Sequence, residues 1–204
     1  MSVKVKICGI TSVADGLAAA EAGADMIGLM FYEGSPRHVS FATAAEISRA
    51  LPAFTVKVGV FVNPNEDSVM RAIGDCGVTL LQFHGEETPQ FCTQFGVMSM
   101  KAFRVRGPET LAELPKYPTD AWLLDAYAAD AYGGTGAKFN WDLALEATQF
   151  GKPIFLAGGL TPDNVAEAVR RTQPFGVDVS SGVESAPGKK DHAKVRAFIE
   201  AVRQ

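Results

Sequence analysis

The sequence predicts an α/β fold, a compact TIM-type (β/α)₈ barrel that spans residues 1–204 as a single domain. Short apolar or β-branched runs alternate with longer stretches of helical periodicity, and the chain holds eight such pairs. No low-complexity segment or interdomain linker separates them. Strands that alternate with helices form βαβ units and a parallel sheet. Eight units fit a closed barrel at the short end of its size range, and an open doubly wound sheet is the alternative.

The eight apolar runs predict strands at residues 3–8, 26–31, 56–62, 78–83, 99–105, 122–126, 153–157 and 175–180. The periodic stretches predict helices at 12–22, 42–51, 65–75, 86–95, 108–114, 141–150, 162–172 and 191–202. Pro64 suits a helix start, and Thr161 is the expected N-cap of the helix over 162–172. A long glycine-rich loop over 127–139 follows the sixth strand, and we expect it to act as a lid.

Composition excludes several classes of protein. Hydrophobic residues make up 47% and charged residues 21%, which is ordinary for a globular protein. The net charge of −4, with no Lys/Arg-rich block, disfavours a nucleic-acid partner. No apolar run approaches the ~18 residues of a membrane span, and charges interrupt the N-terminus before a signal-peptide core. We expect a cytoplasmic protein with no membrane or nucleic-acid partner; the oligomeric state is left open, with a monomer favoured.

Three cysteines occur, with no CxxC pair, which is typical of reduced thiols rather than a disulfide framework. Cys76 and Cys92 lie in helical patterns and are assigned to packing. Cys8 ends the first strand beside Gly9, and period-2 alternation turns it toward the barrel mouth if Val5 and Ile7 face the helices. It is either a small buried hydrophobe or a base whose thiolate a cation such as Lys6 would stabilise.

Two aspartates end later strands at the face where this fold carries its active sites. Asp125 follows an apolar run, and a carboxylate there is costly to bury unless it is paired or used. It is read as a general acid or base, or as a loop cap. Asp178 faces inward between Val177 and Val179. It could contact substrate or pair with Lys6, because the eighth strand adjoins the first in a closed barrel.

Glycine-rich segments follow the last three strands. They contain Gly134 and Gly136, then Gly158 and Gly159, then Ser181 and Gly182. Exposed backbone N–H groups in such loops bind anions, and barrels often hold phosphate with the loops after strands seven and eight. Turns also need glycine, but pairs in both expected places predict a phosphate site.

Two further strand-end residues could bind a ligand. Arg37, on the loop stiffened by Pro36, could hold a carboxylate with two parallel hydrogen bonds, or be plain surface charge. His84 after the fourth strand could contact the same ligand, or serve in capping or packing. No cluster of His, Cys and carboxylates has metal-ligand spacing, so no metal is expected.

These motifs together resemble the phosphoribosylanthranilate isomerase family. The likeness covers nearly the whole chain in the family's order, through Lys4-Val5-Lys6-Ile7-Cys8-Gly9-Ile10-Thr11, Ser35-Pro36-Arg37, Val58-Gly59-Val60-Phe61-Val62, Gln82-Phe83-His84-Gly85, Leu124-Asp125-Ala126, Gly133-Gly134-Thr135-Gly136, Ala157-Gly158-Gly159-Leu160 and residues 176–184.

The resemblance implies a reaction and a role for each matched residue. The family converts N-(5-phosphoribosyl)anthranilate to 1-(2-carboxyphenylamino)-1-deoxyribulose 5-phosphate, an Amadori rearrangement in tryptophan biosynthesis that needs no cofactor. By this resemblance Asp125 is the general acid and Cys8 the general base. Arg37, helped by His84 and Asp178, would hold the anthranilate end, and the glycine loops the phosphate.

Two other functions are alternatives to the one that the resemblance implies. The related histidine-pathway isomerase is expected to use carboxylates in both catalytic roles and to show two similar half-barrels, whereas here the first strand ends in Cys8 and no half-chain repeat is found. A barrel that only binds a phosphorylated ligand would tolerate loss of Cys8 and Asp125.

Overall fold

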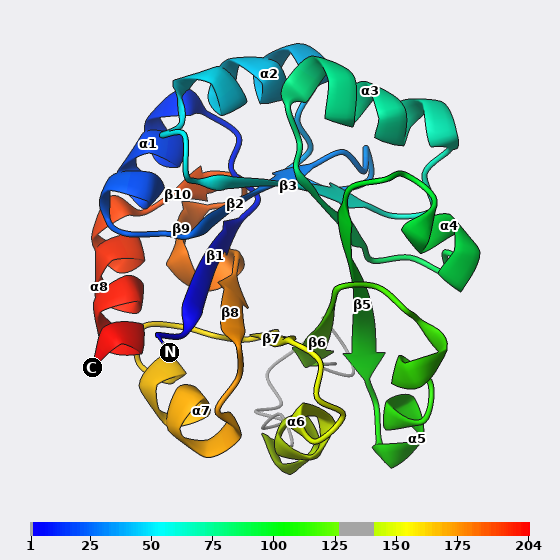
Figure 1. Cartoon of the computed structure of the whole chain (residues 1–204). Coiled ribbons are helices and arrows are strands. Elements are labelled where there is room, and N and C mark those ends of the chain that lie inside the picture. The colour runs from blue at the N-terminus through cyan, green and yellow to red at the C-terminus, as the bar shows by residue number, and fades with distance from the viewer. Residues whose placement is uncertain (1, 127–140) are drawn as a thin grey trace.

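The computed structural model describes residues 2–126 and 141–204, in which eight parallel strands form a closed barrel in chain order (Figure 1). The strands are β1 (Lys4–Cys8), β2 (Met26–Met30), β3 (Val56–Phe61), β4 (Leu80–Phe83), β5 (Met98–Val105), β6 (Ala121–Ala126), β7 (Ile154–Ala157) and β8 (Gly176–Val179). Because β1 pairs with β8 as well as with β2, the sheet has no free edge. The predicted closed barrel is confirmed over the open sheet.

The helices form a ring outside the strands (Figure 1). They are α1 (Val13–Glu21), α2 (Phe41–Ala50), α3 (Glu66–Cys76), α4 (Pro89–Thr93), α5 (Pro108–Leu111), α6 (Trp141–Thr148), α7 (Val165–Thr172) and α8 (His192–Arg203). Pro64 stands just before Asn65, whose side chain caps α3, as predicted. The α4 and α5 helices are shorter than expected, and a 3₁₀ turn, η1 (Leu114–Lys116), follows α5. Within the described residues, no helix is long and apolar enough to cross a membrane.

The start of α7 corrects the sequence prediction. Residues 162–164 form a turn, so the helix begins at Val165 and its N-cap position is Asn164 rather than Thr161. The Asn164 side chain accepts a hydrogen bond from the Thr161 backbone N–H at 2.8 Å. Asn side chains favour such local turns over helical backbone, which explains the later start.

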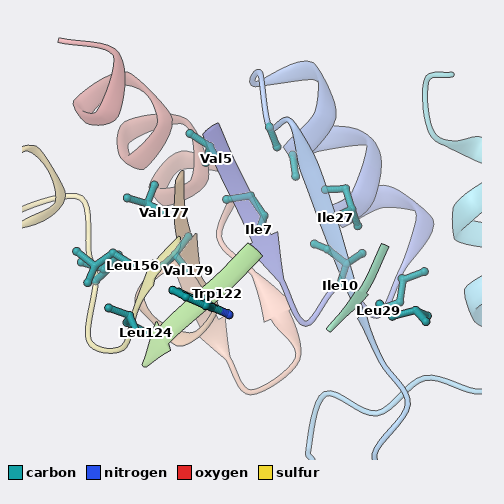
Figure 2. Close-up of a cluster of buried hydrophobic side chains, with 14 of the residues drawn as sticks. Val5, Ile7, Ile10, Ile27, Leu29, Trp122, Leu124, Leu156, Val177 and Val179 are labelled. Carbon is teal, nitrogen blue, oxygen red and sulfur yellow. The ribbon is translucent and has the colours of Figure 1, made fainter. Parts of the chain in front are cut away.

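Two apolar layers follow from the alternation of side chains along each strand. The outer layer lies between strands and helices and includes Val5, Ile7, Trp122, Leu124, Val177 and Val179 (Figure 2). The inner layer fills the barrel and includes Cys8, Val58, Val60, Leu80, Met100, Leu123 and Phe155. Successive strand residues point to opposite faces, so the outward positions fix the inward ones. Cys8, Asp125 and Asp178 therefore point inward.

A small hairpin after β8 was not predicted. A 3₁₀ turn, η2 (Ser181–Val183), leads into β9 (Glu184–Ala186), which pairs antiparallel with β10 (Lys189–Lys190). The turn passes through Gly188, whose φ of +76° is a left-handed conformation that glycine adopts without strain. Thr11 Oγ1 donates to the Gly188 carbonyl at 2.5 Å, so the hairpin is fastened to the loop after β1.

Candidate active site

One cavity of about 260 Å³ lies at the carboxyl ends of the strands. Its lining includes every predicted site residue that the structure describes, namely Cys8, Arg37, His84, Asp125, Gly158, Gly159, Asp178, Ser181 and Gly182, together with Met30, Ser35, Val60, Gln82, Ala157, Leu160, Val179 and Ser180. Gly134 and Gly136, and the expected lid over 127–139, lie outside the described residues. The cavity thus brings the thiol of β1 and the carboxyl group of β6 to one space.

Cys8 is almost fully buried at the mouth end of β1. A side chain at Gly28 on β2 would lie 2.8 Å from Cys8 Sγ and 3.1 Å from Lys6 Nζ. The absence of that side chain therefore leaves room for both groups. Burial raises the pKa of the Cys8 thiol, and the positive charge of Lys6 acts in the opposite direction.

Asp125 faces the cavity because its strand neighbours face the helices. Trp122 and Leu124 belong to the outer layer, which leaves Leu123 and Asp125 on the inner face. The Asp125 side chain is 30% exposed, and its Oδ2 lies 3.2 Å from His84 Nε2. The other ring nitrogen of His84 lies 3.2 Å from Gln82 Nε2. The imidazole is therefore held between a carboxyl group and an amide.

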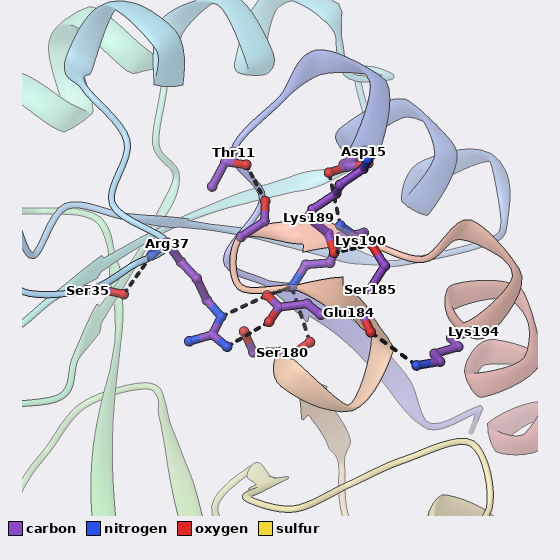
Figure 3. Close-up of polar contacts among 11 residues, drawn as sticks. Thr11, Asp15, Ser35, Arg37, Ser180, Glu184, Ser185, Lys189, Lys190 and Lys194 are labelled. Atoms are coloured by element: carbon purple, nitrogen blue, oxygen red, sulfur yellow. Dashed lines mark hydrogen bonds and ion pairs between the residues drawn. The ribbon is translucent and has the colours of Figure 1, made fainter.

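Arg37 reaches the cavity from the loop after β2 and is not plain surface charge (Figure 3). Its Nε donates to Glu184 Oε1 at 2.8 Å and its Nη2 to Glu184 Oε2 at 2.7 Å. A side chain at Gly9, whose φ is +73°, would lie 2.5 Å from Arg37 Cδ. The stem of the arginine thus crosses the end of β1 where glycine leaves space.

Asp178 forms the ion pair with Lys6 that the sequence left as one of two alternatives, with Lys6 Nζ 2.9 Å from Asp178 Oδ1. Asp178 also borders the cavity. The pair is held by strand register, because Lys6 and Asp178 are directly opposed across the β1–β8 seam.

Glycines after β7 and β8 also line the cavity. Gly158 and Gly159 both have positive φ angles, of +87° and +64°. At Gly182 any side chain would collide with the Leu160 carbonyl oxygen, so the two loops approach at backbone distance. Such bare, turned backbone is suited to direct N–H groups at an anion.

Sequence reasoning missed several residues at this site. Gln82 lies on the inner face of β4, fully buried, and its Oε1 has no hydrogen-bond partner among the described residues. Its place in the strand alternation was a usable signal. Glu184, which binds Arg37, and Lys190, which binds Glu184, gave no such signal, because the unpredicted hairpin brings them to this place.

Comparisons with known proteins agree with this arrangement. Residues 5–201 match the family model for N-(5'phosphoribosyl)anthranilate (PRA) isomerase. The N-(5'-phosphoribosyl)anthranilate isomerase of Geobacter sp. (strain M21) is 53% identical over 201 residues, covering 98% of each chain. The crystal structure of phosphoribosyl anthranilate isomerase from Thermotoga maritima superposes with a TM-score of 0.92 at 39% identity, covering 98% of each chain.

A further solved structure of the same kind contains a ligand. It is a phosphoribosyl anthranilate isomerase in complex with reduced 1-(o-carboxyphenylamino)-1-deoxyribulose 5-phosphate, with a TM-score of 0.89, 37% identity and 98% coverage of each chain. The identity and coverage are far above what a shared barrel alone requires. The chain belongs to the N-(5'-phosphoribosyl)anthranilate isomerase family.

Proposed function

We propose that this protein isomerises N-(5-phosphoribosyl)anthranilate to 1-(2-carboxyphenylamino)-1-deoxyribulose 5-phosphate, the Amadori step of tryptophan biosynthesis. The observation that carries the proposal is one cavity lined by Cys8, Asp125 and the glycine loops. The reaction moves a proton within one molecule, which needs an acid and a base but no redox cofactor. The cavity offers one of each, on different strands.

Asp125 is the general acid of this scheme. It protonates the ribose ring oxygen, so that the C1–O bond breaks and the ring opens to a Schiff base. His84, 3.2 Å from the Asp125 carboxyl group, keeps that group directed at the cavity. A positioned acid or base typically contributes about 10²–10⁴-fold in rate.

Cys8 is the general base. Its thiolate removes the proton from C2 of the Schiff base, and the electron pair of the C–H bond moves to form the enolamine, which then tautomerises to the ketone. Because burial raises the thiol pKa, the thiolate depends on nearby positive charge, which Lys6 supplies.

The two charged ends of the substrate are held on either side of this pair. We assign the phosphate to Gly158, Gly159, Ser181 and Gly182, with Gly134 and Gly136 expected to add to the site from the loop outside the described residues. Arg37 binds the anthranilate carboxylate. Asp178 borders the cavity and holds Lys6 in place by the ion pair between them. Holding both ends fixes the reacting carbon atoms between acid and base.

The proposal is tested by activity of the purified protein. Loss of the anthranilate fluorescence of the substrate reports turnover, and rescue of a tryptophan-requiring strain that lacks this isomerase reports function in a cell. A protein that binds inorganic phosphate but neither turns over the substrate nor rescues the strain would contradict it. The three free cysteines support a reducing, cytoplasmic location.

A further inference from the structure

We propose that Glu184 is the positioning residue of Arg37, so that Arg37 presents a fixed cationic edge to the substrate carboxylate. Lys190 offsets the negative charge of Glu184. This inference rests on the proposed function and extends it to the hairpin after β8. Glu184 acts on the reaction through Arg37, which it binds directly. Lys190 binds Glu184, and its positive charge also lowers the pKa of Cys8.

The geometry of the guanidinium supports this assignment. Glu184 occupies the side edge of Arg37, formed by Nε–H and one Nη2–H, at 2.8 and 2.7 Å. Among the described residues the guanidinium has no other acceptor. The end edge, with one N–H on each of Nη1 and Nη2, is left as a second pair of parallel donors. Such a pair matches the two oxygens of a planar carboxylate.

Burial makes Glu184 a rigid support. Its side chain is only 5% exposed, whereas that of Arg37 is 22% exposed and borders the cavity. Burial alone would raise the pKa of Glu184, but hydrogen bonds from Arg37 and Lys190 outweigh it and lower that pKa. The carboxylate therefore stays charged at neutral pH and keeps both hydrogen bonds from Arg37.

Lys190 completes the charge balance. Its Nζ is fully buried, 2.8 Å from Glu184 Oε1 and 3.2 Å from the Ser180 carbonyl oxygen (Figure 3). An Arg37–Glu184 pair alone would be neutral and would attract an anionic substrate weakly. Burial lowers the pKa of Lys190, and its hydrogen bond to Glu184 opposes that effect. With Lys190 protonated, the group of three carries one net positive charge, at the side of the cavity that receives the carboxylate.

The hairpin itself is anchored on several sides. The Lys190 backbone N–H donates to Asp15 Oδ2 at 3.2 Å, and Lys194 Nζ donates to the Glu184 carbonyl at 3.1 Å (Figure 3). A side chain at Gly188 would lie 3.1 Å from the Pro36 carbonyl oxygen, so the hairpin turn also packs on the loop that carries Arg37. The same hairpin thus lies against the loop that carries Arg37 and binds its guanidinium.

Steady-state kinetics of Glu184→Gln test the proposal. We expect KM for N-(5-phosphoribosyl)anthranilate to rise roughly tenfold or more while kcat stays within about threefold, because a binding contact is loosened and the proton transfers are not. Affinity for inorganic phosphate should not change. If Glu184 instead competes with the substrate for Arg37, KM falls, and a lowered or unchanged KM would overturn the proposal.

A double-mutant cycle shows whether Glu184 acts through Arg37. Arg37→Met alone should raise KM at least as much as Glu184→Gln, and adding Glu184→Gln to Arg37→Met should raise it no further. Additive effects of the two changes would overturn the proposal. Wild-type turnover is measured alongside, so that an inactive wild type rejects the proposed function while an unchanged Glu184→Gln rejects only this inference.

Lys190 has a matched control on the same strand. Lys190→Met should raise KM by a smaller factor than Glu184→Gln, whereas Lys189→Met, with an equal charge change on an exposed side chain, should not alter it. Equal effects of the two lysines would overturn the role of Lys190. Should Glu184→Gln fold poorly because Lys190 is left unpaired, the double variant Glu184→Gln/Lys190→Met removes both charges and should still show the raised KM.

Discussion

Lys6 and Asp178 form a buried ion pair across the seam where the barrel closes. Lys6 Nζ lies 2.9 Å from Asp178 Oδ1, and the lysine side chain has no solvent exposure. Burial would lower the pKa of Lys6, but the charges of Asp178 and Cys8 outweigh it and raise that pKa. A permanently charged ammonium therefore lies beside the proposed base, and the two partners act on Cys8 with opposite sign.

The pH profile of Lys6→Met should show the effect of the Lys6 charge on the Cys8 thiol. Removal of the cation raises the pKa of Cys8 beyond the increase that burial already causes. A smaller fraction is then thiolate at neutral pH, so the rising limb of kcat/KM should move to higher pH. Lys4→Met is the control, since Lys4 is on the same strand but pairs with Asp25 at the surface. An unshifted limb in Lys6→Met would mean that Lys6 does not support the thiolate.

Asp178→Asn should move the same limb the other way. The negative charge of Asp178 raises the pKa of Cys8, so its removal favours the thiolate and shifts the limb to lower pH. The pH dependence of kcat/KM reports groups of the free enzyme, which is the state described here. A shift to higher pH in this variant would contradict the assignment of opposite signs. Lys6→Met/Asp178→Asn, which leaves no unpaired charge, should lie between the two single variants.

Cys8→Ala should abolish turnover without loss of phosphate binding. The thiol is the base and not an anchor, so we expect kcat to fall by at least about 10²-fold. Isothermal titration with inorganic phosphate should give the wild-type affinity. Cys76→Ala is the matched control, because Cys76 is a buried thiol that donates a hydrogen bond to the Phe41 carbonyl oxygen and does not line the cavity. Near wild-type rates in Cys8→Ala would reject the role of Cys8.

Asp125→Asn should lose most of the activity, because an amide cannot deliver the proton that opens the ribose ring. We expect a loss of about 10²-fold or more in kcat. His84→Gln should cost less, since His84 orients Asp125 and is not the acid in our scheme. A drop of only a few-fold in Asp125→Asn, or a larger drop in His84→Gln, would point to His84 or another group as the acid.

The sequence predicted those parts of the site that depend on strand alternation and chain order. Period-2 alternation was sufficient to direct Cys8, Asp125 and Asp178 inward, and barrel closure was sufficient to place Asp178 beside Lys6. The support of Arg37 was out of reach, because its partner Glu184 is 147 residues away in the chain. No local pattern links two side chains that meet only when a short polar hairpin folds back.

Lys101 and Glu87 form another buried ion pair, which the sequence did not predict, and it gives a prediction about stability. Both side chains are almost fully buried, and Lys101 Nζ lies 2.9 Å from Glu87 Oε2. Glu87 also accepts hydrogen bonds from the backbone N–H groups of Asn63 and Gly85, at 2.8 and 3.0 Å. The pair thus fixes the loop that follows β4, in which His84 is the neighbour of Gly85.

Lys101→Met should lower the free energy of unfolding by about 3–5 kcal/mol, because the Glu87 carboxylate is left buried without its counter-charge. Urea denaturation followed by circular dichroism measures this loss. In Lys101→Met/Glu87→Gln no buried charge is unpaired, and a neutral side chain can still accept one of the backbone hydrogen bonds, so the double variant should be more stable than the single one. A double variant that is less stable than Lys101→Met would show that hydrogen bonding by the carboxylate, rather than the charge balance, holds this loop.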